Sequence, residues 1–168
     1  MTALVLIAKQ PIPGRVKTRL CPPLTWEQAA RLASAAIDDT IEATHSLPVA
    51  RRILLYDGDQ VPPSARDFEL LPQGPGTLDE RLAIAFDAIR EPRGELVRGV
   101  AMSRDDTGRE QRRRLVAAGL RVGELATLVD VDTIDDAHTV AAIAPHSDFA
   151  RVFREFAGRL LVAPERSG

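Results

Sequence analysis

Residues 4–20 of the chain read LVLIAKQPIPGRVKTRL. The unbroken aliphatic run at its start, Leu4 to Ala8, is typical of a strand that is buried on both faces of a parallel sheet. The prolines and the glycine that follow end such a strand and open a loop. This stretch therefore predicts a central strand that carries a basic loop at its carboxyl end.

Strand-like and helix-like segments alternate along the rest of the chain. Helical spacing predicts helices over residues 25–45, 77–89, 106–119, from 133 onward and over 149–160, and alternation with turn signals predicts strands over 52–56 and 68–71. Four pairs have the spacing of helix caps: Thr25 with Gln28, Thr77 with Glu80, Thr107 with Glu110, and Thr133 with Asp136. The pattern predicts an α/β fold, a three-layer α/β/α sandwich with a mostly parallel sheet, with the last helix covering one sheet face.

Size and composition agree with one domain. The chain has 168 residues, of which 45% are hydrophobic and 27% charged, so we expect a single domain over residues 1–162 and a flexible tail over 163–168. One cysteine excludes an intrachain disulfide framework, and no apolar run approaches the roughly 20 residues of a membrane span. We therefore expect a cytoplasmic location and no membrane partner.

The loop after the first strand is the strongest functional signal. Both lysines of the chain, Lys9 and Lys17, lie in it, whereas all other basic residues are arginine. No acidic residue precedes Glu27, so this end of a chain with net charge −2 is locally cationic. Such a local charge favours a small anion such as phosphate, and not a nucleic acid, which needs a broad basic face.

Five residues of this loop are candidate phosphate or nucleotide ligands. They are Lys9, Gly14, Arg15, Lys17 and Arg19, where the glycine lets the backbone approach the anion and the cations neutralise it. The spacing is not that of a P-loop, because Val16 and not glycine precedes Lys17. The alternative is a solvated basic loop held by its prolines.

Two further positions have chemistry that fits a bound nucleotide. Asp130 and Asp132 are two residues apart, so in an extended segment both carboxylates point to one side, as ligands of Mg²⁺ or Mn²⁺ beside a polyphosphate would. Gln73 and Gly74 begin a tight turn that could approach a base or sugar. The alternatives are that the aspartates only end a strand and cap the next helix, and that the turn only precedes a capped helix.

The segment from Lys9 to Leu20, followed by Pro23-Leu24 and a capped alanine-rich helix, resembles the opening of a bacterial family of arsenosugar-biosynthesis-type glycosyltransferases. That family is similar to the GT-A, or nucleotide-diphospho-sugar transferase, superfamily. Further similarity covers residues 73–82, 99–103, 106–108 and 130–133. The resemblance implies that Lys9, Arg15 and Lys17 hold nucleotide phosphates and that Asp130 or Asp132 helps to bind Mg²⁺.

The chain also departs from that family. After Ile89 it passes through residues 91–94 directly to Gly99, without the family's central block, which carries a Ser-Asp-x-Pro metal motif and an Asp-Gly-Gly-aromatic motif. Loss of interior strands would expose apolar sheet, which re-closure of the sheet or a second copy in a homodimer would have to cover.

Three functions therefore remain open. The first is a nucleotide-sugar-dependent glycosyltransferase impaired by the lost block, with Asp130, Asp132 or the Asp105-Asp106 pair supplying the metal site. The second is a non-catalytic nucleotide-binding or dimeric remnant, and the third is a nucleotidyltransferase. The sequence assigns no catalytic residue.

Overall fold

The structure is a computed structural model that describes residues 3–88, 94–102, 104–123 and 128–160. Its strands are β1 (Ala3–Lys9), β2 (Arg51–Asp57) and β3 (Glu69–Pro72). Its α-helices are α1 (Trp26–His45), α2 (Leu78–Ala88), α3 (Thr107–Ala117), α4 (Ile134–Ile143) and α5 (Asp148–Leu160), with short 3₁₀ turns η1 (Thr18–Leu20), η2 (Pro63–Ala65) and η3 (Gly94–Leu96). The predicted α/β class is confirmed.

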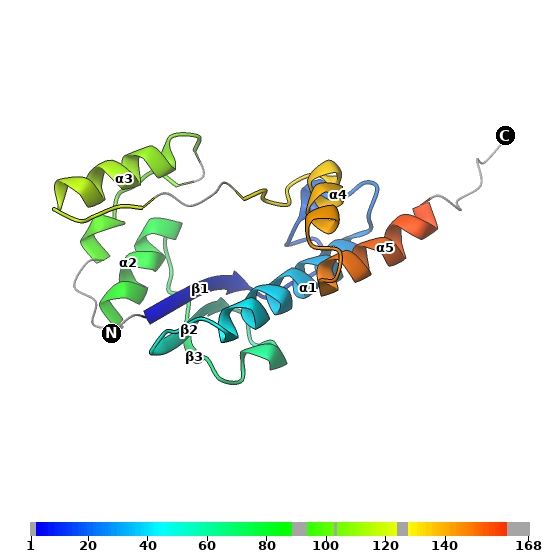
Figure 1. Cartoon of the computed structure of the whole chain (residues 1–168), viewed down its shortest axis with the longest axis horizontal. Helices are drawn as coiled ribbons and strands as arrows, with labels where there is room; N and C mark the ends of the chain where they lie inside the picture. The colour runs from blue at the N-terminus through cyan, green and yellow to red at the C-terminus, as the bar shows by residue number, and fades with distance from the viewer. Residues whose placement is uncertain (1–2, 89–93, 103, 124–127, 161–168) are drawn as a thin grey trace.

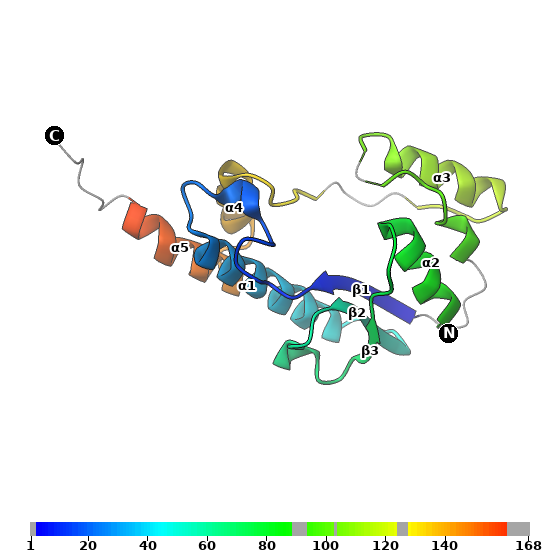
Figure 2. The ribbon, with the colours of Figure 1, turned by 180° about the vertical axis from the view of Figure 1, so that it is seen from behind.

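The three strands form one parallel sheet in the order β1-β2-β3. In the pairing of β1 with β2, Leu6 lies opposite Leu54 and Ala8 opposite Tyr56. Helix α1 packs on one face of this sheet, where its Ile37 and Ile41 contact that row of side chains. Helix α2 lies on the side away from α1 (Figures 1 and 2).

The start of α1 shows why this helix forms where the sequence predicts. The Gln28 amide donates to the Thr25 hydroxyl at 3.2 Å, and the Thr25 amide donates to the Gln28 side-chain oxygen at 2.8 Å, so the predicted capping box is confirmed. The same device is confirmed for Thr133 and Asp136 at the start of α4. At α3 the prediction is wrong, because the Thr107 hydroxyl donates to the Ala101 carbonyl at 2.7 Å instead of capping the helix.

The main core does not lie where the sequence places it. Helix α5 was expected to cover the sheet, but it packs on α1 and α4 (Figure 1). Its Phe149, Phe153 and Phe156 are buried against Leu32 of α1 and Leu20 of η1. The helical period identified the apolar face of α5 correctly, but this period cannot specify which partner covers the face.

Strand β1 differs from its predicted position. Among the described residues it pairs only with β2, so it is an edge strand, and its side chains are half-buried or exposed. The segment around Val97 and Val100, which follows η3, forms turns in the described part of the chain and adds no strand to the sheet. The prediction of a central strand is therefore wrong for this sheet of three strands.

Two other predictions have narrower outcomes. The single domain over residues 1–162 stays a prediction, and the proposed tail over 163–168 lies outside the described residues. No helix in the described ranges combines the length and the apolar character that a bilayer span requires.

Candidate functional site

The basic loop folds back onto the end of β1. The Lys9 ammonium donates a hydrogen bond of 2.9 Å to the carbonyl of Arg15, which closes the loop between them. Gly14 has a φ of +74°, a conformation that glycine adopts at low cost, and a Cβ there would lie 3.4 Å from the Trp26 ring. Lys9 therefore organises the loop backbone, while Gly14 lets the loop pass close to the indole.

Lys17 occupies a strained position at the far end of this loop. Its φ of 46° is in the left-handed region, which is uncommon for a residue with a side chain. The turn η1 begins immediately after it, so the backbone reverses and the side chain reaches across toward residues 130–132. Its ammonium lies 3.2 Å from Asp130 Oδ1 and 3.8 Å from Asp132 Oδ1.

Asp132 is held by the start of α4. The Asp132 amide donates to a carboxylate oxygen of Asp136 at 3.2 Å, and Asp136 also accepts from the Thr133 amide at 2.8 Å. The Thr133 hydroxyl also donates to Asp136, at 2.8 Å. This bond first, and the backbone bonds after it, hold the pKa of Asp136 below its ordinary value. Asp132 in turn accepts from the Arg19 guanidinium at 3.2 Å. The capping box thus fixes the segment that meets the basic loop.

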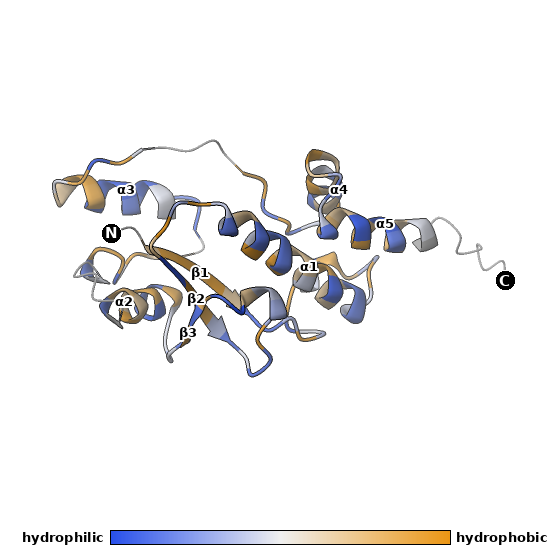
Figure 3. Ribbon diagram, turned by 60° about the horizontal axis from the view of Figure 1, so that its bottom comes forward, coloured by the Kyte–Doolittle hydropathy of each residue, from blue (hydrophilic) through white to orange (hydrophobic). Residues whose placement is uncertain are grey.

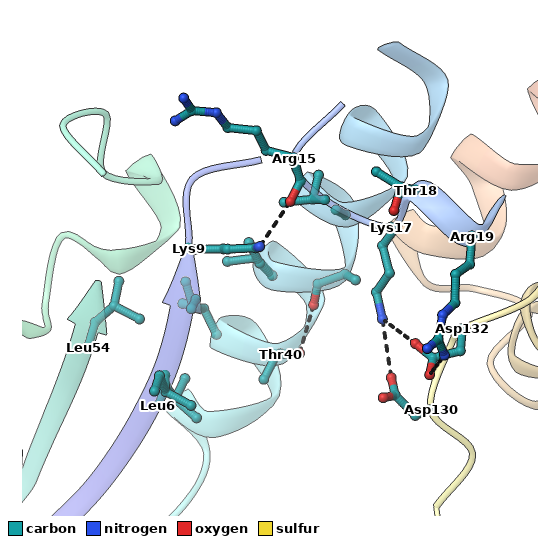
Figure 4. A pocket seen from close by; sticks show the side chains of 17 residues that line it. Leu6, Lys9, Arg15, Lys17, Thr18, Arg19, Thr40, Leu54, Asp130 and Asp132 are labelled. Carbon is teal, nitrogen blue, oxygen red and sulfur yellow. Dashed lines mark hydrogen bonds and ion pairs between the residues drawn. The ribbon is translucent and has the colours of Figure 1, made fainter. Parts of the chain in front are cut away.

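These charged residues surround one cavity of about 660 Å³ between β1, α1 and residues 130–132 (Figure 4). Its charged lining comes from the loop and the acidic segment: Lys9, Arg15, Lys17, Arg19, Asp130 and Asp132. The remaining wall is almost entirely apolar, with Leu6, Ile7, Ala8 and Leu54 from the sheet and Ala33, Ala36, Ile37 and Ile41 from α1. Figure 4 shows the Arg15 guanidinium pointing away from Lys17 and the aspartates.

The structure brings six of the predicted site residues together and leaves others apart. Gly14 shapes the loop without lining the cavity. The Gln73 amide lies at the strand ends, where it donates to the carbonyls of Ala8 at 2.8 Å and Leu55 at 3.2 Å. Arg81 of α2 donates to its oxygen at 2.8 Å, and neighbouring Gly74 lies against Ile84. In this structure Gln73 therefore ties β1, β2 and α2 together.

Asp130 and Asp132 supply only some of the ligands that a divalent cation requires. Within the described ranges no three His, Cys, Asp or Glu residues gather as a metal cluster. The Asp105-Asp106 pair lies away from the cavity, beside Arg104 and Arg109 at the start of α3. Two carboxylates suit Mg²⁺ when phosphates and water complete its shell, so Asp130 and Asp132 fit a metal that arrives with a polyphosphate.

The α1 side of the cavity could not be recognised from the sequence. Ala33, Ile37 and Thr40 line it from α1, but their spacing is that of any helix packed on a sheet. The contact of Trp26 with Gly14 likewise joins a helix start to a loop, and no short motif marks it.

Comparison with known proteins supports the fold. No protein-family model matches the chain, and no curated protein gives a significant match. Among solved structures, the chain is similar to a protein from Desulfovibrio desulfuricans G20 that has been proposed to be a nucleotide-diphospho-sugar transferase. The TM-score is 0.78 at 17% identity, and the match covers 93% of this chain and 95% of that one. At this identity the likeness shows a shared fold.

Proposed function

We propose that the cavity at the carboxyl end of β1 binds the diphosphate of a nucleotide sugar, in a protein of the glycosyltransferase type. One observation supports this most: Lys17 and Arg19 meet Asp130 and Asp132, more than a hundred positions away, at one cavity. Carboxyl ends of parallel strands are the usual place for ligands in open α/β sheets. The fold shared with the Desulfovibrio protein agrees with this class.

The cations would act on the leaving group. In glycosyl transfer the bond between the sugar carbon and the diphosphate oxygen breaks, and negative charge develops on the diphosphate. The Lys17 ammonium and the Arg19 guanidinium, released from the two aspartates, would stabilise this charge. A divalent cation on Asp130 and Asp132 would supply further neutralising charge when bound.

A second candidate is nucleotide binding without turnover. Its support is that Lys17 and Arg19 already neutralise both aspartates, and that the described residues contribute no third carboxylate to a metal site here. The two candidates therefore differ in turnover and share the binding site.

Thermal unfolding with and without ligand tests the shared binding site. Nucleoside diphosphates and nucleotide sugars, with Mg²⁺ or Mn²⁺, should raise the Tm by several degrees, since a ligand at about 100 times its Kd adds roughly 2.7 kcal/mol. Lys17→Ala should abolish the shift, while Arg66→Ala, which changes an exposed cation elsewhere on the surface, should keep it. A wild-type protein that no nucleotide stabilises would contradict both candidates.

Donor hydrolysis separates the two candidates. Release of nucleoside diphosphate from a nucleotide sugar, lost in Asp130→Asn, would establish the transferase. Binding without any hydrolysis or transfer would establish the second candidate.

A further inference from the structure

The two edges of the sheet are built differently. Strand β3 is four residues long, ends at Pro72 and carries an ion pair between Glu69 and Arg51. Short length, proline and charge are the devices by which proteins prevent an edge strand from pairing with another chain. The β3 edge is therefore protected.

Strand β1 has none of these devices over most of its length. It is seven residues long, and every residue from Ala3 to Ala8 is apolar (Figure 3). Ile7 is 41% exposed, and the cavity beside the strand has an apolar wall formed by Leu6, Ala33 and Ile37. A long, uncharged edge strand with an exposed isoleucine is suited to pairing with another strand.

We propose that β1 pairs antiparallel with β1 of a second copy, which forms a homodimer with one continuous sheet. In the register centred on Leu6, Val5 lies opposite Ile7 of the second copy, Leu4 opposite Ala8 and Ala3 opposite Lys9. Every cross-strand pair is then apolar except the one at each end, and no like charges face each other. The strand is therefore complementary to itself over its whole length.

Charge selects the antiparallel direction. Each copy has four basic residues at this end, of which Lys17 and Arg19 meet Asp130 and Asp132, while Lys9 and Arg15 meet no acid among the described residues. A parallel pair would place the two basic loops side by side. The antiparallel pair separates them by about the length of the strand, roughly 23 Å at 3.3 Å per residue, which exceeds the Debye length of about 8 Å in physiological salt.

The same arrangement brings the two α1 helices together. A twofold axis normal to the sheet places both α1 helices on one face, next to each other. The half-buried Ile37 of each copy then faces its counterpart, while each basic loop stays at the open end of its own strand. The proposal does not depend on what the loop binds.

Sedimentation velocity over a range of concentrations tests this. The wild-type protein should dimerise, and Ile7→Lys should weaken dimerisation at least about tenfold because it puts a charge in the interface. The matched control is Leu70→Lys on β3, whose side chain is similarly exposed at 48% and which should dimerise normally. Circular dichroism checks that each variant is folded.

The register has its own test. Val5→Glu should weaken the dimer as Ile7→Lys does, and the double variant should restore it, because residues 5 and 7 of the two copies are then opposite charges. A wild-type protein that is monomeric at all concentrations would overturn the proposal. A dimer that Leu70→Lys disrupts and Ile7→Lys does not would also overturn it, as would a double variant that is not restored.

Discussion

Lys17 Nζ lies 3.2 Å from Asp130 Oδ1, although 113 positions separate the two residues. The Asp130 side chain is 83% exposed and the Lys17 side chain 30%. The carboxylate therefore lies at the surface, while the ammonium is held in the loop. Under the proposed function, a phosphate oxygen of the ligand would take the position that this carboxylate occupies. The protein's own acids would then compete with an anionic ligand for Lys17.

We expect Asp130→Asn to strengthen the binding of inorganic pyrophosphate without metal, by several-fold, because it frees the Lys17 ammonium. With Mg²⁺ present the same variant should bind a nucleoside diphosphate more weakly than the wild type, because a metal ligand is lost. Isothermal titration calorimetry measures both. Asp67→Asn, at an ion pair far from the cavity, is the control, and equal pyrophosphate affinities for all three proteins would contradict this competition.

The backbone of Lys17 predicts a difference between two substitutions. Both Lys17→Ala and Lys17→Gly remove the ammonium, so both should lose nucleotide binding. Only glycine relieves the left-handed strain, which costs a residue with a Cβ about 1–2 kcal/mol and is partly offset by the greater freedom of glycine in the unfolded chain. Urea denaturation should show Lys17→Gly as the more stable variant by about 0.5–1 kcal/mol, and a less stable glycine variant would exclude the strain.

The cap of α1 should contribute measurably to stability. Thr25→Ala removes the acceptor of the Gln28 amide and should lower the free energy of unfolding by about 1 kcal/mol in urea denaturation. Thr40→Ala removes a hydroxyl that bonds only the Ala36 carbonyl within the same helix, so a much smaller loss is expected. Equal losses of unfolding free energy in the two variants would show that the Thr25 cap does not stabilise the protein more than an ordinary helical hydroxyl.

The second capping box should respond to acid. Because the folded-state pKa of Asp136 is lowered, chiefly by the Thr133 hydroxyl, its contribution is complete above the unfolded value of about 3.9 and disappears as the pH falls through the lower folded value. The stability difference between the wild type and Asp136→Ala should therefore shrink on acidification below about pH 4. Denaturation at a series of pH values measures it, and a difference that does not vary with pH would contradict the assignment.

What could be predicted from the sequence depends on the range of the interactions. The capping boxes at Thr25 and Thr133 and the bounds of α1 were predicted because they depend on residues within one helical turn. The opposite charges of Lys17 and Asp130 suggest their meeting, but the argument from neighbouring strand ends fails, because residues 128–132 form no strand in the described part of the chain. The contrast of lysine with arginine pointed to a loop whose residues line the cavity.

Other features could not be predicted because they depend on distant partners. Whether β1 is central or at an edge is decided by which strand lies beside it, and its own residues read the same in both cases. The partner of α5 is undetermined for the same reason. The bond from Lys9 to the Arg15 carbonyl and the bridge from Gln73 to two strand ends need three-dimensional contacts that no local spacing encodes.

The close approach of Trp26 to Gly14 has a practical consequence. Trp26 is the only tryptophan of the chain, it is 60% exposed, and its ring lies against the loop that carries Lys17. Intrinsic tryptophan fluorescence therefore comes from one indole beside that loop. Ligand-induced movement of the loop would change the intensity and wavelength of this emission, so the unlabelled protein carries its own optical reporter.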